Sequence, residues 1–119
     1  SHILADWMSN FNFLPDPWEG GGNVHRGFKS ALDEVWPELE EQISYLRDTN
    51  RKIWVTGHSL GAALATLAAA RVANVQGLYT YGSPRVGDPE FKENFKVRAY
   101  RFVNNNDIVV KCQYIFTNV

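Results

Sequence analysis

The stretch that decides the fold is residues 53–65, IWVTGHSLGAALA. Its first four residues are mostly β-branched or aromatic and favour a strand, whereas the alanines at its end favour a helix. Between them lies a G-x-S-x-G pattern with Ser59 at its centre. Strand, sharp turn and helix in this order are typical of a nucleophile elbow, which exposes a serine hydroxyl at the carboxyl end of a strand.

The elbow interpretation makes three structural predictions. Ser59 is expected to adopt a strained backbone conformation. We expect glycine to be needed at positions 57 and 61, because side chains two residues before and after the serine would crowd the turn. The N–H of Leu60, at the start of the helix, is expected to be unpaired and able to donate to an oxyanion. Because the five-residue pattern also occurs by chance, the prediction depends on the flanking strand and helix signals.

The chain carries four blocks that together resemble class 3 lipases, the filamentous-fungal type of α/β-hydrolase. In chain order, the blocks are residues 24–28, VHRGF, residues 55–68, VTGHSLGAALATLA, residues 79–87, YTYGSPRVG, and residues 104–109, NNNDIV. They occur in that family's order, and the resemblance covers about residues 1–110. It implies an α/β fold: a three-layer sandwich around a mostly parallel sheet, with residues 1–119 forming a single partial domain that is incomplete at both ends.

The resemblance also implies an activity and a set of site residues. The activity is the hydrolysis of carboxylic esters, with acylglycerols as the first choice and other esters or phospholipids as alternatives. Ser59 would be the nucleophile and Asp107 the acid of a Ser-Asp-His triad, although Asp107 could also be a turn residue within its asparagine run. Leu60 would supply one oxyanion donor. Ser1 is a second candidate donor by its spacing to Trp7, unless Ser1 is a cloning remnant.

The histidine that would complete such a triad is missing from its expected place. All three histidines, His2, His25 and His58, precede Asp107, whereas the family's base follows the acid. The chain is therefore either a piece of a longer enzyme, a catalytically inactive binding module, or an enzyme in which one of these histidines has become the base. We interpret His25 as structural and His58 as a packing or hydrogen-bonding residue.

Composition excludes several other classes of function. The net charge of −1 gives no reason to expect a nucleic-acid partner, and no apolar run is long enough to cross a membrane. No cofactor or metal is implied, because serine-based ester hydrolysis needs none and no metal-ligand pattern occurs. The compartment is unknown, with secretion as the family-based expectation.

Several local elements are also predicted. The resemblance implies a lid within residues 1–23, a lid-like and loop region in which residues 5–13 would contact a lipid interface on opening. The alternative is that residues 5–13 form a short helix that packs on the core. A helix is expected over 28–48 with a kink at Pro37, and its four glutamates should be exposed. Strands are expected at 77–81 and 97–103, and Asp88 should cap a short helix that begins at Pro89.

Overall fold

The structure is a computed structural model that describes residues 14–104 and 110–115, with side chains described over 14–102. Three of the predictions fall outside these ranges. Ser1, the 5–13 region and Asp107 are not among the described residues, so their roles stay predictions.

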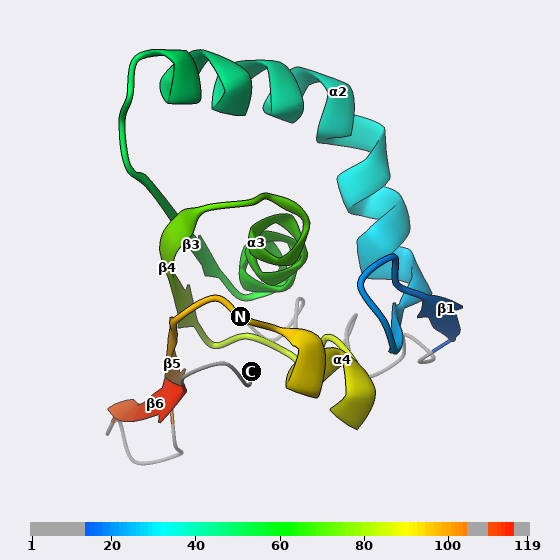
Figure 1. The fold of residues 1–119 in the computed structure, drawn as a ribbon. Coiled ribbons are helices and arrows are strands. Elements are labelled where there is room, and N and C mark those ends of the chain that lie inside the picture. The colour runs from blue at the N-terminus through cyan, green and yellow to red at the C-terminus, as the bar shows by residue number, and fades with distance from the viewer. Residues whose placement is uncertain (1–13, 105–109, 116–119) are drawn as a thin grey trace.

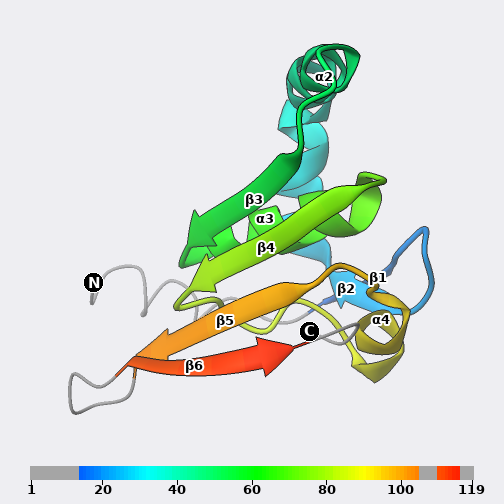
Figure 2. The same ribbon diagram turned by 60° about the vertical axis from the view of Figure 1, so that its left-hand side comes forward.

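Two sheets and three helices make up the described fold (Figure 1). A small hairpin pairs β1 (Pro15–Pro17) with β2 (Asn23–His25), antiparallel. The main sheet has the order β3-β4-β5-β6, and Figure 2 shows its four strands side by side. Its strands are β3 (Ile53–His58), β4 (Val75–Tyr81), β5 (Ala99–Asn104) and β6 (Val110–Ile115). The helices are α2 (Arg26–Asp48), α3 (Leu60–Arg71) and α4 (Pro89–Asn94).

The main sheet is mostly parallel, as predicted. β3, β4 and β5 run parallel to one another, and β6 returns antiparallel along β5. β6 begins at Val110 and pairs with β5 over its whole length. No local motif marks this strand, because the partner that defines it lies elsewhere in the chain.

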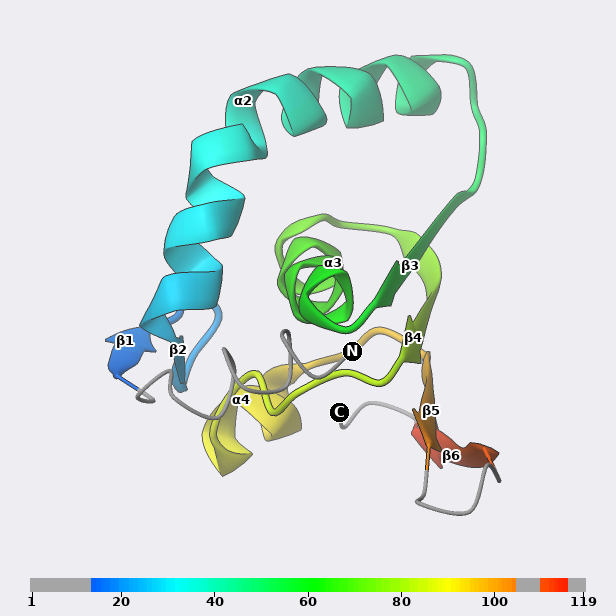
Figure 3. The same ribbon diagram turned by 180° about the vertical axis from the view of Figure 1, so that it is seen from behind.

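The helix that follows the elbow forms the centre of the core. Figures 1 and 3 show α3 enclosed between α2 and the sheet. Its small residues allow this close approach: Ala62, Ala63 and Ala69 are fully buried, as is Leu67. Alanine is a strong helix former with no side chain to exclude a neighbour, so the same residues both form the helix and fit it against the strands.

The long helix α2 bends around α3 near Pro37 (Figures 1 and 3). Proline lacks the N–H of the helical ladder and clashes with the preceding turn, so a kink is expected there. The bend confirms the prediction, and the helix continues through it as one element. Its four glutamates are exposed, also as predicted: Glu34, Glu38, Glu40 and Glu41.

One arginine, at the carboxyl end of α3, joins three elements of the fold. The guanidinium of Arg71, at the end of α3, lies over the rings of Trp18 and Trp36, 4.9 and 4.8 Å from their centroids. The same group forms ion pairs with Glu19 at 3.1 Å and with Asp33 at 2.9 Å. Hairpin, α2 and α3 are therefore tied together at one side chain that is only 12% exposed.

The two faces of the main sheet differ. One face packs against α3, and in the described part of the chain no helix covers the other (Figures 1 and 2). That second face carries stacked aromatic pairs across the strands, Tyr79 with Tyr100 and Tyr81 with Phe102, each with ring centroids 4.9 Å apart. Trp54 beside them is 57% exposed. The described residues thus supply two layers of the predicted three-layer sandwich.

Candidate active site

Ser59 has the strained backbone that the elbow interpretation predicts. Its φ is 57° and its ψ is −120°, in a region that a residue with a side chain rarely adopts. Strain of this kind costs about 1–3 kcal/mol and persists only where the surroundings impose it. Here the surroundings are β3 on one side and the first turn of α3 on the other, so the strand and helix fix the serine between them.

The two glycines of the pattern serve different purposes. A Cβ built on Gly57 would lie 2.3 Å from the carbonyl oxygen of Gly61 and 2.8 Å from the Cα of Ala62. Gly57 is therefore required by the close approach of α3 to β3, as predicted. A Cβ on Gly61 would meet no atom of another described segment within 4 Å, so the prediction that Gly61 avoids crowding is wrong. Gly61 contributes the backbone that approaches Gly57, whereas its own Cβ position faces open space.

Backbone hydrogen bonds hold Ser59 and leave a donor beside it. The Ser59 N–H donates to the carbonyl oxygen of Tyr81 at 2.8 Å, which links the elbow to the end of β4. The Ser59 carbonyl oxygen accepts from the N–H groups of Ala62 and Ala63, which begins the helical ladder. The Leu60 N–H makes no hydrogen bond to any residue that the structure describes. An unpaired N–H at a helix start, next to a half-buried serine, is the kind of donor that stabilises an oxyanion.

The segment that leaves β4 is a feature that the sequence did not reveal. Residues 81–83 are held by the bond from Ser59 to Tyr81, by a bond from the Gly82 N–H to the Phe102 carbonyl oxygen at 2.9 Å, and by a bond from the Arg101 Nη2 to the Ser83 carbonyl oxygen at 3.1 Å. These contacts connect the elbow to β5, the strand that leads toward residue 107. No local pattern could have identified Arg101, because its partner is a backbone oxygen 18 residues away.

His25 is a helix cap, which confirms its structural interpretation. Its Nδ1 accepts from the N–H groups of Gly27 and Phe28 at 3.1 and 3.3 Å, and its ring stacks on Phe28 with centroids 4.0 Å apart. Burial lowers the pKa of His25 below its ordinary value, which keeps Nδ1 unprotonated and able to accept. A nitrogen already committed to two backbone donors is poorly suited to take a proton from Ser59.

His58 does not pack as predicted. Its side chain is exposed, and it makes no hydrogen bond to the described residues.

Asp88 caps α4 as predicted: its Oδ1 accepts from the Phe91 N–H at 2.9 Å. That hydrogen bond is the main reason that the pKa of Asp88 lies below its usual range. Within the described residues, no group of three or more potential ligands is placed to hold a metal ion.

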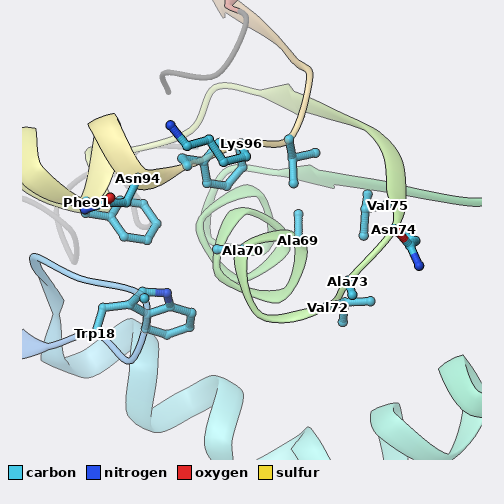
Figure 4. Close-up of a pocket in the computed structure, with 13 residues that line it drawn as sticks. Trp18, Ala69, Ala70, Val72, Ala73, Asn74, Val75, Phe91, Asn94 and Lys96 are labelled. Atoms are coloured by element: carbon cyan, nitrogen blue, oxygen red, sulfur yellow. The ribbon is translucent and has the colours of Figure 1, made fainter.

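Two hollows near α3 differ in their relation to Ser59. Figure 4 shows a pocket of about 370 Å³ at the carboxyl end of α3, lined by Trp18, Phe91 and residues 72–75. It lies about 18 Å from Ser59, the length of the 12-residue helix at 1.5 Å per residue, so it is remote from the elbow. An apolar groove of about 530 Å³ runs between α2, β3 and α3, and Gly61 lies at the edge of this groove.

Among the described residues no helix is both long and apolar enough to cross a membrane.

Comparisons with known proteins agree with this geometry. The family model for "Lipase (class 3)" matches residues 1–117. The chain is 40% identical to the secreted mono- and diacylglycerol lipase 1 of Fusarium solani over 117 residues, which covers 89% of this chain and 35% of that protein. It is 36% identical to a lipase of Rhizomucor miehei, over 92% of this chain and 34% of that protein.

Solved structures support the fold. The triacylglyceride lipase of Rhizomucor miehei superimposes with a TM-score of 0.73 at 24% identity, over 99% of this chain and 59% of that one. The chain spans about a third of the length of the two curated relatives described above. The family match covers residues 1–117, and it agrees with the strained Ser59, the close approach of α3 at Gly57 and the mostly parallel sheet. The chain belongs to the class 3 lipase family.

Proposed function

We propose that this chain forms the nucleophile-bearing part of a carboxylic ester hydrolase that acts on acylglycerols. The observation that carries the proposal is the geometry of Ser59, whose backbone is strained at a strand-to-helix turn with the free Leu60 N–H beside it. Strain at a half-buried serine is retained where it positions a reactive group, and no packing requirement of the described core explains it.

The proposed reaction gives each site residue one role. Ser59 Oγ attacks the ester carbonyl carbon while a general base takes its proton, and the Leu60 N–H donates to the oxyanion that forms. Ser1 is the candidate for a second oxyanion donor. The protonated base then gives its proton to the leaving alcohol oxygen. In the second half of the reaction the base takes a proton from water, the water oxygen attacks the acyl carbon, and the proton is returned to Ser59 Oγ as the acid leaves.

Asp107 is proposed to orient the base and to stabilise its charge. We propose that the base is a histidine outside the described residues, because neither described histidine suits the role. His25 Nδ1 accepts two backbone hydrogen bonds, and His58 is an exposed residue of β3 with no hydrogen bond to the elbow among the described residues.

The substrate and setting follow from the relatives' names. A relative named as a mono- and diacylglycerol lipase supports acylglycerols over other esters, and its description as secreted supports an extracellular site of action. In this proposal the 5–13 region contacts the lipid interface, and residues 1–119 belong to one α/β-hydrolase domain.

The test is the hydrolysis of p-nitrophenyl butyrate and of a monoacylglycerol, by the chain and by the longest reading frame that contains it. Ser59→Ala should lower kcat/KM by about 10³-fold or more, because the nucleophile is lost. Ser30→Ala, which alters an exposed serine on α2, should stay within about twofold of the parent. A folded parent that hydrolyses neither ester in either form would leave a non-catalytic binding module as the better interpretation, and equal activity of both serine variants would refute Ser59 as the nucleophile.

A further inference from the structure

A third hollow lies on the α3 side of the sheet. Its volume is about 430 Å³, and we name it the Arg101 pocket. Its floor is formed by Thr66 of α3 and Thr80 of β4, both buried, and its walls by residues 83–89, the start of α4, and Arg101 of β5. Arg101 lies opposite Thr80 in the strand register, so the guanidinium enters the pocket from the sheet.

The lining of this pocket is strongly cationic. Arg85, Lys92 and Arg101 all contribute to it, and Asp88 is the one acidic residue that lines it. Both oxygens of Asp88 already have partners, since Oδ1 accepts from the Phe91 N–H and Oδ2 accepts from the Asn23 amide at 3.3 Å. Asp88 is therefore occupied in capping α4 and forms no ion pair with the three cations.

Arg101 is also short of acceptors. Its Nη2 donates to the Ser83 carbonyl oxygen at 3.1 Å, and its Nε is buried with no hydrogen-bond partner among the described residues. No carboxylate in the described part of the chain forms an ion pair with it. A partly buried guanidinium that lacks a counter-ion is costly, and an unpaired buried donor adds the cost of its desolvation.

We infer that the Arg101 pocket holds an oxyanion, a carboxylate or a phosphate, that pairs with the Arg101 guanidinium. Both groups are planar or multidentate acceptors that match the donors of a guanidinium, and charge-assisted bonds of this kind are the strongest that proteins make. Lys92 and Arg85, both exposed at the rim, add attraction without needing to be buried.

The proposed ligand is a small anion from solution that carries a carboxylate or phosphate group. It would reach the pocket past the exposed side chains of Arg85 and Lys92.

The experiment is isothermal titration of the protein with inorganic phosphate and with acetate, at constant ionic strength. The parent is expected to bind one equivalent of anion. Arg101→Gln then weakens binding by about tenfold or more, as the loss of a charge-assisted hydrogen bond predicts. Arg85→Gln, which changes an exposed residue and should fold normally, weakens binding by about two- to fivefold. Lys52→Gln, an exposed cation ahead of β3, leaves it within twofold.

The inference is overturned if the parent binds neither phosphate nor acetate. It is also overturned if binding is unaffected by Arg101→Gln and Arg85→Gln, which would indicate surface association. None of these outcomes depends on ester hydrolysis.

Discussion

The two glycines of the elbow should respond to the same substitution with opposite signs. In Gly57→Ala, the new methyl group lies 2.3 Å from the Gly61 carbonyl oxygen, where ordinary contacts begin at 3.4 Å. The obstructing atoms belong to the backbone of α3, so no side chain can rotate away, and the helix must move by roughly 1 Å relative to β3. Overpacking of this kind costs about 1–3 kcal/mol. The smaller backbone entropy of the unfolded alanine chain returns only part of this, about 0.5–1 kcal/mol.

Gly61→Ala meets no such obstacle, because no atom lies within 4 Å of its new methyl group. Gly61 is the second residue of α3, and alanine is favoured over glycine in helices by about 1 kcal/mol in the interior and by less in the first turn. We therefore expect Gly57→Ala to lower the free energy of unfolding by about 1 kcal/mol, and Gly61→Ala to raise it by up to about 1 kcal/mol.

Urea denaturation followed by circular dichroism measures both effects. With a slope of about 1–3 kcal/mol per molar urea, the midpoint for Gly57→Ala should fall by roughly 0.3–1 M, whereas that for Gly61→Ala should stay level or rise. The steric argument is refuted if Gly61→Ala is destabilised as much as Gly57→Ala, or if the Gly57→Ala midpoint equals that of the parent.

Three further changes test other parts of the structure. Ser59→Gly should raise the free energy of unfolding by about 1 kcal/mol by relieving a positive φ while abolishing ester hydrolysis, and a lower midpoint would argue against strain at this residue. Because the folded pKa of His25 is lowered, its contribution to stability is complete above the unfolded pKa of 6.5 and is lost as the pH falls below it. Asparagine also caps a helix but does not titrate, so His25→Asn should reduce the decrease in urea midpoint between about pH 7 and 5. If the midpoint of this variant depends on pH as strongly as that of the parent, His25 is not the neutral cap described above. Arg71→Lys keeps the charge but loses the stacking on Trp18 and Trp36 and should cost about 1 kcal/mol in urea denaturation, whereas a midpoint equal to the parent's would mean that charge alone matters.

The parts of the structure that the sequence predicted are those encoded locally. The strand before Ser59, the helix after it, the cap at Asp88 and the kink at Pro37 each depend on residues within a few positions of one another. The mostly parallel character of the sheet followed from the family resemblance.

The features that were missed depend on distant partners. The purpose of Gly61 became clear only with the position of Gly57 across the turn, and the start of β6 only with its pairing to β5. Arg101 gave no signal at all, because a strand arginine is identified as a buried cation only when its neighbours in the sheet are known.

The elbow is assembled from a short and continuous piece of chain. β3, α3 and β4 follow one another between residues 53 and 81, and β3 packs directly on both α3 and β4. The backbone hydrogen bonds of Ser59 to the described residues all lie within this unit, since its N–H donates to Tyr81 and its carbonyl oxygen accepts from Ala62 and Ala63. Residues 53–81 therefore carry both the strained conformation and the contacts that impose it.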